Sequence, residues 1–276
     1  MYLSFKIDGD ELDRRMGGGL YVGQIVTILG ASGEGKTLLS IRLAYGVIKN
    51  GSNICYVSSQ FPVREFISEA ETLGYGMFNE ILSDKASFIT SVFILRKNKR
   101  ADLDDLLSLD KVKEKQVLII DSLSPAMFKD FDISSFLERL RKFSEGRIVI
   151  ITMNPDELDA KAMSKVNQLS TTIIHMRSKD LAGERKHYID LMKFPMAMKN
   201  FQQSIPFRIE PKRGLVVEIS SVSLLNLRSE DIWQKRSHRI RSRMPLTGIL
   251  IWPIISSITG EAQEGHRSLS PCRTTS

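Results

Sequence analysis

One eight-residue stretch limits the possible folds of this chain more than any other. It reads Gly30-Ala31-Ser32-Gly33-Glu34-Gly35-Lys36-Thr37 and matches the phosphate-binding P-loop pattern G-x-x-x-x-G-K-[ST]. The apolar, β-branched run 24–29 before it predicts a buried strand, and 38–50 after it carries apolar residues at helical spacing. A strand that turns into a helix through glycines presents backbone N–H groups and a helix N-terminus to phosphate oxygens. The stretch therefore predicts a nucleotide-binding site.

Each part of this loop has an expected role. We expect Lys36 to reach the β- and γ-phosphates of ATP and the Thr37 hydroxyl to ligate Mg²⁺. The remaining candidates for nucleotide contact are Gly30, Ala31, Ser32, Gly33, Glu34, Gly35 and Leu38. The alternative is a glycine-rich turn that matches the pattern by accident.

A second stretch, 116–121, consists of an apolar run that ends in an acid, Asp121. In a P-loop protein this is the Walker B pattern, and the run predicts a central parallel strand buried on both faces. At the carboxyl end of that strand, Asp121 would hold the water shell of Mg²⁺ beside Thr37. Because many strands end in aspartate, the signal depends on the P-loop that precedes it.

Strand and helix patterns alternate through the first two thirds of the chain. Further strands are predicted at 53–59, 87–95 and 147–152, and helices at 63–73, 102–112, 133–143 and 156–169. Four short strands then follow without helices between them, at 171–177, 187–193, 206–209 and 215–219. This order predicts an α/β fold with a three-layer αβα core, a mostly parallel central sheet and a C-terminal antiparallel extension.

Near the N-terminus, the pattern of 7–21 predicts a short helix that ends in the glycine-rich turn 17–19. This turn is either a plain connector or a place where the backbone passes close to the nucleotide.

Charge and cysteine content limit the possible partners of the protein and its cellular compartment. The formal net charge of +7 permits nucleic acid or an acidic membrane surface as a partner but requires neither. The two cysteines, Cys55 and Cys272, argue against a disulfide framework. The N-terminus has no signal-peptide pattern, and no apolar run is long enough to span a membrane. We therefore expect a cytoplasmic protein.

The sequence predicts two parts, an ATP-binding domain at 1–223 and a basic tail at 224–276. The tail carries eight Lys/Arg against four Asp/Glu and includes the basic run 236–243. We expect it to be poorly ordered. The alternative is a patch for nucleic acid or lipid headgroups.

Four stretches resemble the FlaH (ArlH) family of accessory ATP-binding proteins of the archaeal flagellum, the archaellum, within the RecA/KaiC-like P-loop superfamily. They are 10–18, 43–46 with 56–58, 119–124, and 207–211 with 219–220. The resemblance covers roughly 5–223 and leaves the tail unmatched. It implies a protein that binds ATP and Mg²⁺ at the base of the archaellum motor.

The resemblance also implies partners and a location. It implies a nucleotide-dependent regulator of the motor ATPase FlaI, working beside the membrane protein FlaJ and a ring-shaped scaffold. Similar proteins form homo-oligomeric rings, which we take here as a hexamer. The expected location is cytoplasmic, at the inner face of the cell membrane, and peripheral to the membrane through these partners.

Departures from the family pattern predict slow hydrolysis. RecA-like ATPases carry a glutamate at the end of the second strand, where this chain has Gln60. A neutral amide orients water but cannot accept its proton. The late Lys-x-Arg of the KaiC branch reads Lys193-Phe194-Pro195 here, and Asn154 stands where the family often has histidine. We therefore expect an ATP-binding, weakly or non-hydrolysing regulatory component, with Lys36 and Gln60 as candidate catalytic residues.

Two alternative functions share the same fold. One is a recombinase-type ATPase acting on nucleic acid, which is disfavoured because the P-loop starts at Gly30 and leaves no room for a preceding DNA-binding domain. The other is a KaiC-like timing or signalling ATPase with autokinase activity, which the missing Lys-x-Arg disfavours. Fold alone does not decide among these functions.

Overall fold

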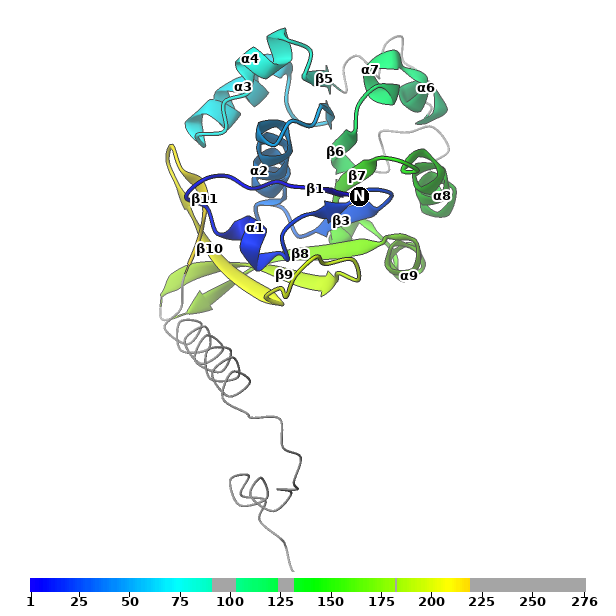
Figure 1. Cartoon of the computed structure of the whole chain (residues 1–276). Helices are drawn as coiled ribbons and strands as arrows, with labels where there is room; N and C mark the ends of the chain where they lie inside the picture. Colours follow the sequence, from blue (N-terminus) through cyan, green and yellow to red (C-terminus); the bar gives the residue numbers. More distant parts are fainter. Residues whose placement is uncertain (91–102, 124–131, 182, 219–276) are drawn as a thin grey trace, which may run out of the picture. The chain divides into compact units, whose positions relative to one another are not determined.

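In the described part of the chain, the central feature of the computed structural model is a nine-stranded sheet with helices on both faces (Figure 1). Residues 1–90, 103–123, 132–181 and 183–218 are described. The strand order is β11-β10-β9-β8-β3-β7-β6-β4-β5. The strands are β3 (Ile25–Leu29), β4 (Ile54–Ser58), β5 (Ala86–Thr90), β6 (Val117–Leu123), β7 (Ile148–Met153), β8 (Thr172–Leu181), β9 (Glu184–Lys193), β10 (Ser204–Glu210) and β11 (Gly214–Val217).

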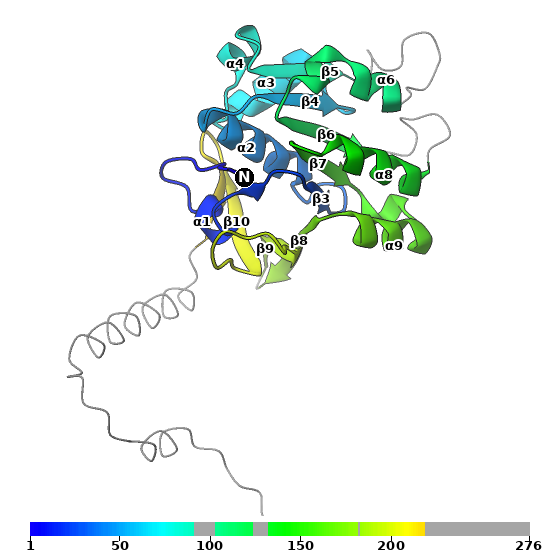
Figure 2. The same ribbon diagram turned by 45° about the vertical axis from the view of Figure 1, so that its right-hand side comes forward.

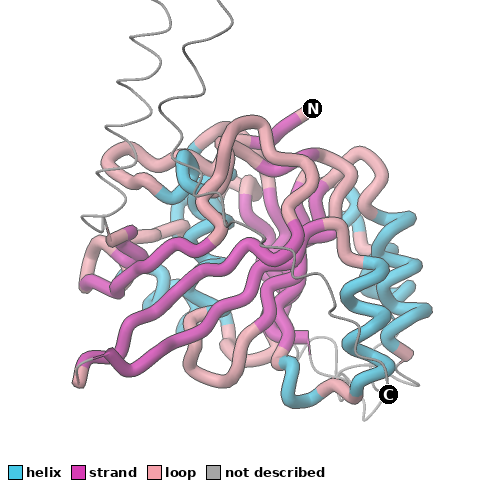
Figure 3. Tube along the Cα trace, turned by 90° about the horizontal axis from the view of Figure 1, so that it is seen from below, coloured by secondary structure: helices cyan, strands magenta, loops and turns pink. Residues whose placement is uncertain are grey.

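The sheet changes from parallel to antiparallel at β8. From β8 through β3, β7, β6 and β4 to β5, neighbouring strands are parallel. On the other side of β8, the pairs β8–β9, β9–β10 and β10–β11 are antiparallel. Figure 3 shows the long β8–β9 hairpin leaving the parallel part of the sheet. The predicted mostly parallel sheet with a C-terminal antiparallel extension is confirmed.

Helices cover the two faces of the sheet separately (Figure 2). On one face lie α1 (Leu12–Arg15), α2 (Lys36–Lys49), α3 (Val63–Thr72) and α4 (Phe78–Leu82). On the other lie α6 (Leu103–Ser108), α7 (Asp110–Lys113), α8 (Ile133–Phe143) and α9 (Ala160–Leu169). The three predicted layers are thus present.

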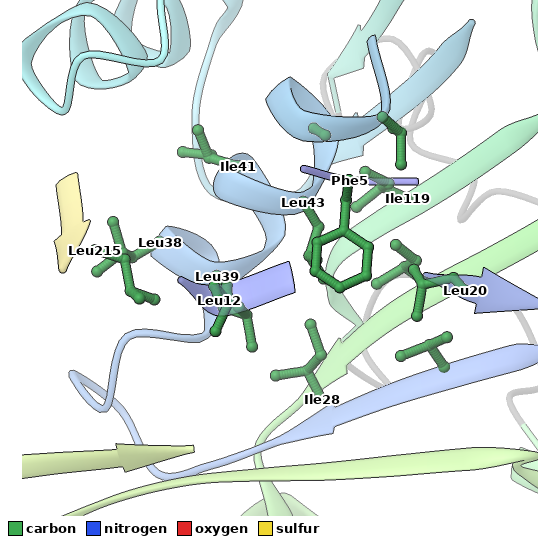
Figure 4. Packing of buried hydrophobic residues seen from close by; sticks show 14 of the residues in the cluster. Phe5, Leu12, Leu20, Ile28, Leu38, Leu39, Ile41, Leu43, Ile119 and Leu215 are labelled. Carbon is green, nitrogen blue, oxygen red and sulfur yellow. The ribbon is translucent and has the colours of Figure 1, made fainter. Parts of the chain in front are cut away.

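Each central strand contributes to two apolar cores. Val26 and Ile28 of β3 pack with the α2 face, where Figure 4 shows Ile28 near Phe5 and Leu39. The alternate residues of the same strand, Ile25 and Leu29, pack with the opposite face. Burial on both faces explains why the strand reads as an unbroken apolar run in the sequence.

The N-terminal segment forms a separate two-stranded sheet and packs against the main apolar core through Phe5, Leu12 and Leu20. β1 (Tyr2–Leu3) pairs antiparallel with β2 (Leu20–Tyr21), and α1 lies between them in the chain. At the glycine turn that follows α1, Lys199 N–H donates to the Gly17 carbonyl at 3.1 Å. Gly17 has φ +87°, and a Cβ there would lie 3.1 Å from the Lys199 carbonyl oxygen. The turn is therefore packed against the β9–β10 loop.

The structure corrects several element boundaries. The single helix predicted at 102–112 is two helices, because Leu109 between α6 and α7 is extended, with ψ 134°. The helix predicted at 156–169 is the 3₁₀ turn η2 (Pro155–Glu157) followed by α9, which starts where Asp159 accepts from Ala162 N–H at 2.6 Å. The two-residue strands β1 and β2 and the five-residue α4 were not predicted, since they are too short to show periodicity.

Some predictions lie outside the described residues. They are the second half of the strand predicted at 87–95, the beginning of the helix predicted at 102–112, and the tail at 224–276 with its basic run.

Candidate functional site

The P-loop joins the carboxyl end of β3 to the start of α2. Gly35 is the N-cap of α2 and is left-handed, with φ +92°, a conformation that a residue with Cβ adopts at a cost. The first hydrogen bond of the helix runs from Leu39 N–H to the Gly35 carbonyl at 3.0 Å. The N–H groups of 36–38 therefore precede the helical ladder, and the first turn of α2 contains no acidic residue. This end of α2 suits an anion.

The beginning of the loop is held against β8. A Cβ on Gly30 would lie 2.9 Å from the carbonyl oxygen of Met176. Along the loop, Ala31 is half-buried, while Ser32 and Gly33 are exposed. Leu38 is buried in the apolar core near Leu215 (Figure 4), so its side chain serves packing.

The side chain of Lys36 folds back inside the curve of the loop. It is only 8% exposed, and its Nζ donates to the carbonyl oxygens of Gly30 at 2.7 Å and Ala31 at 2.8 Å. Burial lowers the pKa of Lys36, and the largest opposing influence is the carboxylate of Asp121. An ammonium in this position is available to an anion held by the loop.

Asp121 lies in β6, 1% exposed, and collects hydrogen bonds from three hydroxyl groups. Its Oδ1 accepts from Thr152 Oγ1 at 2.5 Å and from Thr37 Oγ1 at 3.3 Å. Its Oδ2 accepts from the hydroxyl of Tyr56 at 2.6 Å. The structure thus brings Thr37 and Asp121 together, although β7 lies between β3 and β6 in the sheet.

Sequence reasoning missed Tyr56 and Thr152, the other two hydroxyl donors to Asp121. Each carries a hydroxyl in a mostly apolar strand, and each is fully or almost fully buried. Burial, followed by the negative charge of Asp121, raises the pKa of Tyr56 well above its ordinary value. A hydroxyl in an apolar strand was the available signal, but its partner is far away in the sequence.

Gln60 follows β4 at the same edge of the sheet. Ser58 at the end of β4 is in register with Asp121, and Ser59 N–H donates to the Asp121 carbonyl at 2.8 Å. Ser59 Oγ also donates to the carbonyl of Ser122 at 2.8 Å. The chain is therefore tied to the end of β6 just before Gln60, whose side chain is exposed. Its catalytic role stays a prediction.

Two further residues singled out in the sequence have partners within their own chain. Asn154 Oδ1 accepts from Asp156 N–H at 3.1 Å and caps η2. Lys193 Nζ donates to the carbonyl oxygens of Ser170 at 2.6 Å and Asn167 at 3.1 Å, at the C-terminal end of α9. Both side chains have structural roles here.

The donor set fits a magnesium nucleotide. The loop offers N–H groups and a buried ammonium, which suit phosphate oxygens. Thr37 and Asp121 offer oxygen atoms, the ligand type that Mg²⁺ prefers. When bound, the metal would neutralise phosphate charge, with Thr37 and Asp121 as the residues beside it.

Comparisons with known proteins agree with this geometry. A family model described as the KaiC ATPase matches residues 6–221. The archaeal flagellar ATP-binding protein FlaH of Methanocaldococcus jannaschii is 33% identical over 222 residues, which cover 78% of this chain and 94% of the relative. FlaH of Methanococcus voltae is 29% identical over 230 residues, 80% of this chain and 99% of the relative.

A solved structure of a FlaH protein is also similar to this chain. The crystal structure of flagellar accessory protein FlaH from Methanocaldococcus jannaschii superposes with a TM-score of 0.74 at 30% identity. The match covers 80% of this chain and 100% of that one.

None of the helices in the described part of the chain is both long and apolar enough to cross a bilayer.

Proposed function

This chain belongs to the KaiC family of ATPases, in the group of archaeal flagellar ATP-binding proteins named FlaH, and from that premise we propose that it is a nucleotide-regulated component of the archaellum motor. It binds ATP with Mg²⁺ and hydrolyses it slowly or not at all. Its bound nucleotide controls its association with other parts of the motor.

The observation that carries this proposal is the set Lys36, Thr37 and Asp121 at one end of the sheet. Lys36 lies inside the loop, and Thr37 lies 3.3 Å from Asp121 Oδ1. These groups supply phosphate binding and metal ligation. Slow turnover is proposed because Gln60, just after β4, is a neutral amide at a position where a carboxylate would accept a proton from water.

The names of the relatives support a role in the archaeal flagellum. A flagellar ATP-binding protein acts with a motor, and we propose that this chain binds a secretion-type motor ATPase and a ring-shaped scaffold as a homo-oligomeric ring. It would reach the inner face of the cell membrane through these proteins. Nucleic acid is not the proposed ligand.

Equilibrium binding of a fluorescent ATP analogue tests the first part. Lys36→Ala is expected to weaken binding by at least about tenfold, because it removes a charge-assisted contact to phosphate. Lys49→Ala is the matched control, since Lys49 lies at the other end of α2 and pairs with Glu80 at 3.3 Å. Equal affinity of wild type and Lys36→Ala would refute nucleotide binding at this loop.

Steady-state hydrolysis and a pull-down test the second part. Turnover by the purified protein is expected well below about 1 s⁻¹, the lower end of ordinary enzymes. Retention of the motor ATPase is expected to differ between ATP and ADP. Strong stimulation of hydrolysis by DNA would instead support the recombinase-type alternative.

A further inference from the structure

The hydroxyl of Tyr56 lies between the P-loop helix and the Walker B carboxylate. It is 2.6 Å from Asp121 Oδ2 on β6 and 2.7 Å from Ser40 Oγ on α2. Tyr56 is 1% exposed, and Ser40 and Asp121 are buried to a similar degree. One phenolic oxygen therefore connects β4, β6 and the helix that follows the phosphate loop.

The direction of each hydrogen bond follows from the number of protons. An ionised carboxylate only accepts hydrogen bonds, so the single proton of the Tyr56 hydroxyl points to Asp121 Oδ2. Ser40 cannot receive this proton and is itself the donor. Its single hydroxyl proton has two acceptors within reach, the Tyr56 oxygen at 2.7 Å and the Thr37 carbonyl oxygen at 2.9 Å. The hydroxyl of Tyr56 is thus a fixed donor to Asp121.

The two carboxylate oxygens have different surroundings as a result. Oδ2 is engaged by Tyr56, whereas Oδ1 accepts from Thr152 on β7 and lies 3.3 Å from the Thr37 hydroxyl. Hydrogen bonds from opposite sides fix the rotation of a carboxylate, which a metal site requires for its geometry. Thr37 is the expected metal ligand on the α2 side.

We propose that Tyr56 is a positioning residue for the magnesium site, holding Asp121 with Oδ1 toward Thr37. This role rests on the proposed function, because it presupposes a magnesium nucleotide in the P-loop. Tyr56 acts through Asp121 and touches neither metal nor nucleotide.

The packing of the Tyr56 ring makes a conservative test feasible. The ring lies 4.6 Å from that of Phe66 on α3 and 5.9 Å from that of Phe88 on β5, between centroids. Tyr56→Phe keeps this aromatic cluster and removes only the hydroxyl. The structure therefore separates the hydrogen bond from the hydrophobic contribution of the side chain.

The test is the magnesium gain, defined as the ratio of the dissociation constant of a fluorescent ATP analogue in EDTA to that in excess Mg²⁺. Tyr56→Phe is expected to reduce the magnesium gain about tenfold, the effect of one hydrogen bond to a charged group. Affinity in EDTA is expected to stay within about twofold of wild type, because the loop and Lys36 are unchanged.

Tyr75→Phe is the matched control. Tyr75 is also buried, and its oxygen accepts from Leu215 N–H at 2.8 Å, a contact in the β11 region unconnected with Asp121. This variant is expected to lower the thermal midpoint and leave the magnesium gain at the wild-type value. A purely structural role for Tyr56 would make the two variants behave alike.

The outcomes separate the two proposals. A Tyr56→Phe protein with the wild-type magnesium gain overturns the positioning role alone. A wild-type protein that binds no nucleotide in either condition overturns the proposed function and this role with it. If Tyr56→Phe yields no folded protein, Tyr56→Met, an apolar and adaptable side chain that also lacks the hydroxyl, takes its place: a reduced gain supports the role and an unchanged gain contradicts it.

Discussion

Glu34 in the phosphate loop and Arg185 on β9 form an ion pair, with 3.1 Å between Glu34 Oε1 and Arg185 Nη2. The same oxygen accepts from Ser178 Oγ on β8 at 2.9 Å. The side chain of Glu34 is mostly buried, whereas that of Arg185 is mostly exposed. The tip of the phosphate loop is therefore tied to the β8–β9 hairpin, and a cation offsets a carboxylate beside the expected phosphates.

We predict that Arg185→Ala weakens binding of the ATP analogue about threefold, because it leaves the negative charge of Glu34 without its counter-ion, while solvent at the exposed Arg185 side keeps the effect small. Glu34→Gln/Arg185→Ala is expected to recover the wild-type affinity. A double-mutant cycle of binding constants, including Glu34→Gln alone, measures this coupling. If Arg185→Ala has the same effect with glutamate or glutamine at position 34, the pair does not act on the nucleotide.

Gln60→Glu is expected to raise the hydrolysis rate by at least about tenfold. Gln60 follows β4, whose last residue, Ser58, is in register with Asp121. A carboxylate at position 60 would therefore lie at the edge of the sheet where we expect the water that attacks the γ-phosphate. The measurement is phosphate release at saturating ATP. Gln60→Ala serves as the control and should show no increase. An unchanged rate in Gln60→Glu would mean that position 60 does not reach the attacking water.

Asp10 and Arg42 provide a prediction about stability. Arg42 on α2 is completely buried, and its guanidinium donates to Asp10 Oδ2 at 2.6 Å and to the Phe5 carbonyl at 2.8 Å. Asp10→Ala leaves a buried charge without its counter-ion and removes the acceptor for Leu12 N–H at 2.6 Å. We expect a loss of about 3–5 kcal/mol in the free energy of unfolding, measured with urea.

The neighbouring Asp8→Ala is the control for this experiment. Asp8 is fully exposed and forms a long surface ion pair of 3.7 Å with Lys6. Because such pairs contribute little to stability, Asp8→Ala is expected to leave the urea midpoint unchanged. Similar effects of the two substitutions would show that the Asp10–Arg42 pair does not hold the N-terminal segment on α2.

Asp190 provides a prediction about pH. Burial raises the pKa of Asp190, but hydrogen bonds from Arg177 and Ser204 lower it to a net value below the ordinary 3.8. A carboxyl whose pKa is depressed in the folded state stabilises the protein above the unfolded pKa, and this contribution is lost as pH falls through the folded pKa. The acid loss of stability should therefore begin near pH 4 and grow below it.

We expect Asp190→Asn to lower the free energy of unfolding at pH 7 by about 2 kcal/mol and to flatten its decline below about pH 4. Urea midpoints between pH 3 and 7 measure both effects. Asp180→Asn, at an exposed position on β8, should change neither. If the free energy of unfolding of Asp190→Asn fell as steeply below pH 4 as that of wild type, the low pKa of Asp190 would not be the cause of the acid loss of stability.

The core elements and their order were predictable because they depend on local patterns. The P-loop lies between an apolar strand and a helix with apolar residues at helical spacing, and Asp121 lies near the end of a strand whose preceding residues are apolar. Cys55 lies within the strand predicted at 53–59 and is completely buried. Elements of a few residues, such as α4, were missed because they complete no repeat of the pattern.

The residues of the candidate site were likewise predictable only where a local motif marks them. The sequence indicated Lys36, Thr37 and Asp121, since these residue types at these positions define a phosphate and metal pattern. It did not indicate Tyr56, whose hydroxyl meets Asp121 only because β4 and β6 are neighbours in the sheet. It also gave no sign that Lys193 is engaged by the end of α9.

The phosphate loop, the acid that accompanies it and the αβα class can be recognised from the sequence, because hydrophobic periodicity and a short motif act over neighbouring residues. Which hydroxyls surround Asp121, which cation faces Glu34 and which loop contacts the Gly17 turn become visible in the folded chain alone. Those contacts join residues that are distant in the chain, and their choice depends on the strand order and on the close packing of the whole sheet and its helices.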